Sequence, residues 1–258
     1  MATFKRFITL GDSMTEGMCD EIIDGKYRGW ADRVADVIAT TSSEFTYVSL
    51  AVRGKLLSQV IDDQIPIALK YASDNSTLIS FHAGANDVIR PNYQPAVAKA
   101  RYRSAVDTLI KSGSTVLLFT VIDKVEGKGR TAELWHERFS DFNKNVREVA
   151  AEFGATLVDS KNAPWLGDRR FLAVDRLHLN ADGHFRLANA VLEVLGLTFD
   201  ERWKIQLPPA PKKSKLRKFL EDSRWIITFV IPWLWRRLRG KSSGDGRAAK
   251  YPTPISWR

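Results

Sequence analysis

The chain has 258 residues, of which 44% are hydrophobic and 27% are charged, and its formal net charge at pH 7 is +9. This composition supports a buried core and excludes the disordered and fibrous classes, and the length suits one full-sized domain with an appendage. The single cysteine, Cys19, excludes an internal disulfide and cysteine-rich zinc modules. Because the N-terminal apolar stretch is shorter than a signal-peptide core, we expect a cytoplasmic protein.

The positive charge is confined to the C-terminal segment. Residues 1–198 hold 24 Lys and Arg against 25 Asp and Glu, whereas residues 199–258 hold 15 against 5. The second segment also holds five of the eight Trp and six of the ten Pro. We therefore predict a catalytic domain over residues 1–198, followed by a basic tail over residues 199–258. Only the tail therefore carries the excess positive charge that could bind an anionic partner.

Short β-type runs alternate with longer helical patterns in the predicted domain. The apolar, β-branched runs that predict buried parallel strands are residues 7–10, 46–50, 77–81, 115–121 and 156–158. Apolar residues at helical spacing predict helices over residues 30–39, 57–71, 93–111 and 134–153. Asn180 is positioned to cap a last helix that runs to about residue 195. Repeated β–α units predict a five-stranded parallel sheet that is covered by helices on both faces.

The residues that follow the predicted strands are the first candidates for a site, because ligands bind at the carboxyl ends of parallel strands. After the first strand comes GDSMTEG, in which Gly11 permits a tight turn and Ser13 starts a helix with its hydroxyl exposed. After the second strand, Gly54 lets a backbone N–H approach a substrate. After the third, HAGANDVIRP offers the Asn86 amide as a donor. Asp12 and Asp87 are expected to brace these loops.

A serine nucleophile needs a base beside it, and the base needs an acid that orients it. Beyond the fifth strand, Asp175 lies three residues before His178, close enough in a turn to hold the imidazole. Asp175 could also pair with Arg176. Three other histidines compete for the role of base, and of these His82 is the strongest rival. The other two, His136 and His184, fall in helical patterns that favour surface or packing roles.

Four segments together carry a family resemblance. In order along residues 6 to about 195, GDSMTEG, the Gly54 segment, GAND and DRLH resemble the four signature blocks of the SGNH (GDSL-type) hydrolases. The resemblance implies a three-layer α/β/α fold of flavodoxin-like strand order. It assigns the nucleophile to Ser13, the base pair to Asp175 and His178, and the oxyanion hole to Ser13 N–H, Gly54 and Asn86. The chain departs from many members in having no Pro after His178 and in having His82 beside the Asn86 block.

We therefore predict a serine esterase that hydrolyses carboxylic esters of a small molecule, a lipid or a sugar, with no metal or organic cofactor. Three alternatives stay open: an acyltransferase, a lipid-ester hydrolase acting at a membrane surface, and a membrane-peripheral interaction protein that works through its tail. Arg53, His82 and Arg90 are candidates for binding the substrate, although a salt bridge at a solvated rim fits either arginine equally. The loop of residues 123–131 is expected to border the substrate.

The tail contains an apolar run over residues 225–235, interrupted by Pro232. At 11 residues the run is too short to span a bilayer. Its tryptophans and flanking arginines suit the headgroups of an anionic membrane surface. The alternative, which we favour, is that the run packs against the domain. Nucleic-acid binding by the tail is the least favoured reading.

Overall fold

A computed structural model describes residues 4–123 and 129–257 of the chain. Its centre is a six-stranded sheet with the order β7-β6-β5-β1-β4-β8. The strands are β1 (Arg6–Gly11), β4 (Thr46–Ser49), β5 (Thr77–His82), β6 (Thr115–Phe119), β7 (Thr156–Val158) and β8 (Tyr251–Ser256). All strands of this sheet except β8 pair in parallel, so the five predicted strands and their flavodoxin-like order are confirmed. A short hairpin of β2 (Ile22–Ile23) and β3 (Lys26–Tyr27) stands apart from the sheet.

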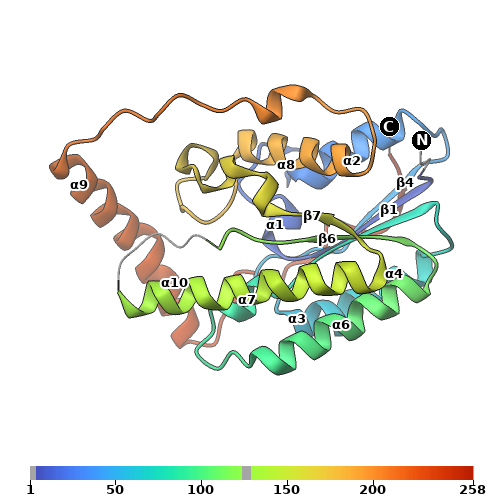
Figure 1. The fold of residues 1–258 in the computed structure, drawn as a ribbon, viewed down its shortest axis with the longest axis horizontal. Coiled ribbons are helices and arrows are strands. Elements are labelled where there is room, and N and C mark those ends of the chain that lie inside the picture. Colours follow the sequence, from blue (N-terminus) through green and yellow to red (C-terminus); the bar gives the residue numbers. More distant parts are fainter. Residues whose placement is uncertain (1–3, 124–128, 258) are drawn as a thin grey trace.

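Helices cover both faces of the sheet. They are α1 (Ser13–Glu16), α2 (Gly29–Ala39), α3 (Leu57–Gln59), α4 (Ile65–Tyr71), α5 (Ala85–Val88), α6 (Pro95–Lys111), α7 (Arg130–Phe153), α8 (Ala181–Val194), α9 (Lys215–Trp225) and α10 (Ile231–Leu238). A π-helical turn joins α3 to α4, a second joins α9 to α10, and short 3₁₀ turns follow β7 and α8. Figure 1 shows α2 and α8 on one side of the sheet and α4, α6 and α7 on the other.

Successive residues of the central strand explain why the sheet is buried on both faces. Phe7 and Ile8 in β1 are both fully buried and point to opposite faces. Phe7 belongs to the apolar layer with Trp30 of α2, whereas Ile8 packs in the layer with Val106 of α6. A strand buried on both faces shows a continuous apolar run, and this pattern is the one that predicted β1.

β8 corrects the prediction of a five-stranded sheet. It pairs antiparallel with β4 at the edge, where Thr46 lies opposite Ser256. The segment reads YPTPIS, and proline is tolerated in a strand only at an edge or an irregularity, because it has no N–H to donate. The end of the predicted tail is thus part of the same sheet as the strands of residues 1–198. The division at residue 198 remains a prediction for the rest of the tail.

Side chains on either side of β8 fasten it to the domain. The ring of Trp257 packs edge-on against Tyr47, with 5.0 Å between centroids. On the other side, Lys250 Nζ lies 2.7 Å from the Asp32 carboxylate of α2, and both side chains are almost fully buried. Removing one member of such a pair leaves a buried charge without a partner, so this contact holds the chain end in place.

His184 couples the packing of α8 to pH. The buried imidazole accepts a hydrogen bond from Trp30 N–H at 3.2 Å and donates from Nε2 to the carbonyl of Met18 at 3.1 Å. Burial lowers the pKa of His184 from 6.5 to about 4. The folded state therefore holds His184 neutral, while the unfolded chain takes up a proton as the pH falls below 6.5. Stability from this group is complete above pH 6.5 and is lost as the pH falls towards 4.

We expect the free energy of unfolding to fall by about 3 kcal/mol over this window because of His184. Urea denaturation at a series of pH values measures the slope. Replacing His184 with Gln should lower the stability at neutral pH and remove that part of the slope. The replacement of the exposed His136 with Gln provides the matched control. Equal slopes in the wild type and the His184→Gln variant would contradict the assignment.

Candidate active site

Ser13 follows the central strand β1 closely, because a tight turn at Gly11 that only glycine can adopt ends the strand. Gly11 has φ +146, and a Cβ at this position would overlap the carbonyl oxygen of His82 on the neighbouring strand β5. The buried Gln64 side chain holds the same residue, accepting from Gly11 N–H at 2.8 Å and donating to its carbonyl at 2.9 Å. Asp12 caps α1, as its expected bracing role requires. The hydroxyl of Ser13 is therefore presented from a rigid turn.

Asp175 and His178 form the pair that the sequence predicted. His178 Nδ1 lies 2.6 Å from Asp175 Oδ2, and the other carboxylate oxygen accepts from the backbone N–H groups of Leu177 and His178. Burial acts to raise the pKa of Asp175, but the hydrogen bonds from His178 and the loop outweigh it and lower the pKa below its ordinary value. An ionised Asp175 at Nδ1 fixes the tautomer in which Nε2 accepts a proton. Arg176 pairs with Asp222 instead, at 2.6 Å.

Cys19, expected from the sequence to be a small buried residue near the pocket, also contacts this pair. Its Sγ lies 3.7 Å from Asp175 Oδ2, so the thiol adds one more donor to the carboxylate. Cys19, Asp175 and His178 also form the one group of ligand-type side chains, among the residues described, that lies close enough to hold a metal ion. Burial, followed by the charge of Asp175, raises the pKa of the Cys19 thiol to about 12. A protonated thiol is a weak metal ligand, which favours the role of hydrogen-bond donor.

The raised pKa of Cys19 predicts slow alkylation. Because the thiolate is the reactive form, iodoacetamide should modify Cys19 at pH 8 roughly 10³-fold more slowly than a free thiol. Intact-mass spectrometry over time measures the rate, and glutathione in the same tube provides the reference. Replacing Asp175 with Asn removes the nearest negative charge and should speed the reaction. Rapid modification of the folded wild type would contradict the placement of Cys19.

Asn86 also lies beside Ser13, but its amide N–H groups already donate hydrogen bonds to other residues. Nδ2 donates to Asp12 Oδ2 at 2.9 Å and to the carbonyl of Lys55 at 3.1 Å. An amide group has two N–H donors, so binding an oxyanion requires one of these bonds to be exchanged. The next residue, Asp87, accepts from the N–H of Leu57 at 2.8 Å, which fits the bracing role expected of it.

Gly54 lies under the C-terminal segment. It has φ +74, and a Cβ here would overlap the hydroxyl of Ser242. The neighbouring Gly244 lies in turn against the carbonyl of Arg53. The Gly54 N–H has no hydrogen-bond acceptor among the residues described, although Gly54 itself does not line the cavity that holds Ser13. Residues 242–244 thus pack on the loop that was predicted to supply an oxyanion donor.

The three residues predicted to bind the substrate have different surroundings. His82 is buried and lines the cavity, and its Nδ1 has no hydrogen-bond partner in the described part of the chain. Arg53 forms an ion pair with Glu16, with Nε 2.9 Å from Oε1, and its guanidinium lies 5.3 Å from the centre of the Tyr27 ring. Neither Arg53 nor Arg90 is among the described residues that line the cavity. Of the three, only His82 has the position that a substrate-binding role requires.

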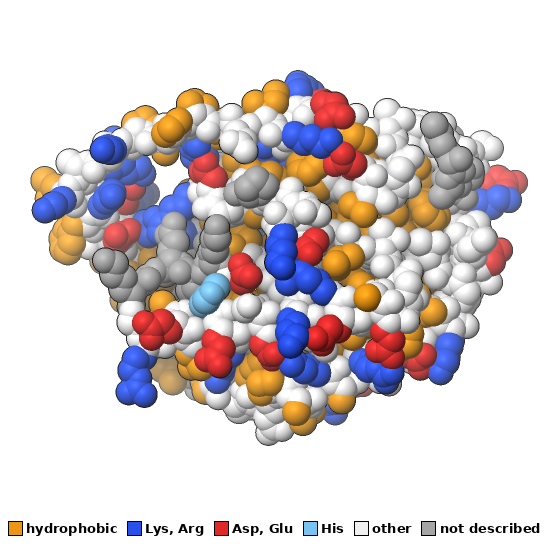
Figure 2. All heavy atoms as spheres, viewed as in Figure 1, with side chains coloured by type: hydrophobic (Ala, Val, Ile, Leu, Met, Phe, Trp, Pro, Cys, Tyr) orange, Lys and Arg blue, Asp and Glu red, His pale blue; other side chains and the backbone are white. Residues whose placement is uncertain are grey.

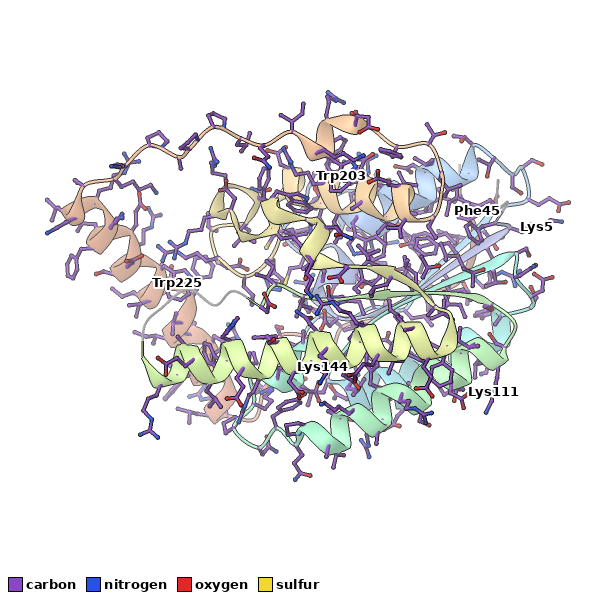
Figure 3. All side chains as sticks on the ribbon, in the orientation of Figure 1. Lys5, Phe45, Lys111, Lys144, Trp203 and Trp225 are labelled. Atoms are coloured by element: carbon purple, nitrogen blue, oxygen red, sulfur yellow. The ribbon has the colours of Figure 1, made fainter. Side chains whose placement is uncertain are left out.

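A cavity of about 690 Å³ joins Ser13, Asn86 and His178. Most of its wall is apolar and comes from both halves of the chain. The wall includes Ile89, Val121, Ile122, Phe139, Leu172, Leu177, Leu187, Val194, Trp203 and Trp225. Figure 3 labels both tryptophans. Trp203 lies in the 3₁₀ turn that follows α8, and Trp225 is the last residue of α9. Of the loop predicted to border the substrate, residues 124–128 lie outside the described residues.

Solved structures show the same class of fold. The acetylxylan esterase Axe2 from Geobacillus stearothermophilus superposes with a TM-score of 0.62 at 19% identity, covering 78% of this chain and 100% of that one. LAE5, an alpha/beta hydrolase enzyme from the metagenome of Lake Arreo, Spain, gives 0.62 at 19% identity over 76% and 97% of the two chains. TesA gives 0.57 at 20% identity over 74% and 97%. The fold is thus the α/β fold of SGNH hydrolases.

The family follows from the sequence comparison. The model of the GDSL-like Lipase/Acylhydrolase family matches residues 9–186, and the chain belongs to that family. It is therefore a hydrolase of the esterase class. No curated protein matches the chain.

Proposed function

We propose that the protein is a serine esterase in which Ser13, His178 and Asp175 act as the catalytic triad. The observation that carries the proposal is the 2.6 Å contact between His178 and Asp175 at the wall of the cavity that Ser13 also lines. The relatives support the same residue types. Axe2 structures include a serine-to-alanine and a histidine-to-alanine variant, and each is described as a catalytic mutant.

The reaction proceeds in two halves. Ser13 Oγ attacks the ester carbonyl carbon while His178 Nε2 takes the hydroxyl proton, and the charge of Asp175 stabilises the imidazolium that forms. The C–O bond to the alcohol then breaks, and His178 gives its proton to the leaving alkoxide. Water attacks the acyl-enzyme by the same steps, which releases the acid and restores Ser13.

The oxyanion needs donors that are already oriented. We assign them to the N–H groups of Ser13 and Gly54 and to the Asn86 amide. The Gly54 N–H, which has no acceptor in the part of the chain that the structure describes, supports its part. The bond from Asn86 to the carbonyl of Lys55 is the one that we expect to exchange for the oxyanion.

The wall of the cavity favours an apolar acyl group. A volume of about 690 Å³ exceeds the need of an acetyl group, and aliphatic and aromatic side chains form most of the lining. Burial of each methylene contributes about 0.8 kcal/mol. We therefore assign esters of medium-chain or long-chain acids as the preferred substrates.

A panel of p-nitrophenyl esters from acetyl to dodecanoyl tests this assignment. We expect kcat/KM to rise with acyl length to at least the octanoyl ester, with most of the gain in KM. A preference for the acetyl ester would instead match the activity named for Axe2 and overturn the assignment of acyl length. Adding an alcohol acceptor and analysing the products separates hydrolysis from acyl transfer.

A further inference from the structure

The segment of α9, the π-helical turn and α10, residues 215–238, forms one helix, which we call the C-terminal helix. It contacts the loop that carries Asp175 and Arg176. The indole Nε1 of Trp225 donates to the carbonyl of Asp175 at 2.8 Å. The guanidinium of Arg176 pairs with Asp222 and lies 4.9 Å from the centre of the Trp225 ring. One face of this helix is therefore held against the loop of Asp175 and Arg176. Figure 1 shows α9 at the left end of the molecule. None of the described helices is both long and apolar enough to cross a bilayer.

The C-terminal helix also exposes apolar side chains along its whole length. The exposed fractions are 68% for Leu216, 67% for Phe219, 64% for Ile227, 53% for Ile231, 55% for Trp235 and 82% for Leu238. We call these six residues the apolar stripe. A continuous exposed stripe of this size on a folded chain marks a surface that binds another protein or a membrane.

Basic side chains accompany the apolar stripe. On the C-terminal helix and just before it, Lys212, Lys215, Lys218, Arg224 and Arg236 have no carboxylate partner among the described residues. Figure 2 shows Lys and Arg side chains beside hydrophobic ones over α9, at the left end of the molecule. A second copy of the chain would bring two segments of the same net positive charge together, whereas an anionic lipid surface complements that charge.

We propose that the C-terminal helix docks flat on an anionic lipid bilayer, with the apolar stripe inserted among the acyl chains and the cations among the headgroups. An apolar face bordered by Lys and Arg is the pattern of helices that lie in the membrane interface. Trp225 lines the cavity of Ser13, so docking brings the cavity to the lipid. The delivery of lipid esters to Ser13 rests on the proposed function, but the binding to lipid does not.

Co-sedimentation of the full-length chain with vesicles tests the proposal. Vesicles of equal parts phosphatidylglycerol and phosphatidylcholine should pull the protein down at low salt, and vesicles of phosphatidylcholine alone should bind it at least about tenfold less. The Ser13→Ala variant should sediment like the wild type. The Ser13→Ala variant thus distinguishes a loss of catalysis from a loss of lipid binding.

Two triple variants separate the apolar contribution from a general change of surface. The test variant carries Phe219→Gln, Ile227→Gln and Leu238→Gln, and the control carries Ile22→Gln, Val97→Gln and Leu134→Gln, which are exposed elsewhere. The test variant should bind anionic vesicles at least about tenfold more weakly, whereas the control should bind like the wild type. Both should hydrolyse a water-soluble ester at the wild-type rate, because none of these residues lines the cavity.

A second pair of variants tests the charge. The test variant carries Lys215→Gln, Lys218→Gln and Arg224→Gln, and the control removes the same charge through Lys70→Gln, Arg101→Gln and Lys161→Gln. The first should weaken binding to anionic vesicles by at least about tenfold and the second by much less. Equal losses in both variants would overturn the docking surface. So would failure of the wild type to bind anionic vesicles, or a stripe variant whose only effect is to dissociate a dimer in analytical ultracentrifugation.

Discussion

Replacing Ser13 with Ala should lower kcat for a water-soluble ester roughly 10⁴- to 10⁶-fold. The variant keeps the Gly11 turn and the cap of α1 from Asp12, because neither contact uses the Ser13 hydroxyl. It loses the one atom that forms the acyl-enzyme in the proposed mechanism. The remaining rate would come from the oxyanion donors and from binding alone. Initial rates at saturating substrate measure the effect.

The matched control for this variant is Ser58→Ala. Ser58 is a half-buried serine in the short helix α3, and it does not line the cavity. Its replacement should leave kcat unchanged, and both variants should melt within a few degrees of the wild type. A Ser13→Ala enzyme with more than about a tenth of the wild-type kcat would show that another nucleophile carries the reaction.

Replacing Asp175 with Asn should lower kcat roughly 10⁴-fold with little change in KM. The carboxylate accepts hydrogen bonds from His178 Nδ1, from two backbone N–H groups and from Cys19. An amide cannot accept all of them, and it leaves the imidazolium of His178 without a counter-charge. The tautomer with a basic Nε2 is then disfavoured. The same assay as for Ser13→Ala measures the loss.

Asp182→Asn provides the comparison for Asp175→Asn. Asp182 lies four residues beyond His178, in the first turn of α8, and its side chain is exposed. Its replacement changes the same formal charge near the same loop and should leave kcat within about twofold, since charge at a helix start contributes less than about 1 kcal/mol. Comparable losses in the two variants would show that Asp175 acts through the net charge of the region and not through His178.

The core of the fold was predictable because its signals are local. The five parallel strands are continuous apolar or β-branched runs, and each site segment follows one of them, so the carboxyl edge of the sheet gathers Ser13, Asn86 and His178. The spacing of Asp175 and His178 predicted their contact for the same reason. A separation of three positions in a turn brings the two side chains within hydrogen-bond reach.

The parts that escaped prediction depend on contacts between distant segments. The edge strand β8 contains Pro252 and Pro254, which argue against a strand until a neighbour such as β4 is known. The contact of Cys19 with Asp175 joins residues that lie 156 positions apart, and that of Gln64 with Gly11 joins residues 53 apart. The sequence predicted an apolar run in the tail, but not that Trp225 borders the cavity.

Covalent labelling with a fluorophosphonate tests the central assignment most directly. The reagent phosphonylates only a serine that is activated by a base and lies beside an oxyanion hole. Its reaction therefore tests the nucleophile, the base and the oxyanion donors together. Peptide mapping by mass spectrometry should find one adduct, on Ser13. The adduct should vanish in Ser13→Ala and form far more slowly in His178→Ala. An enzyme that hydrolyses esters yet carries its adduct on another residue, or forms none, would contradict the account.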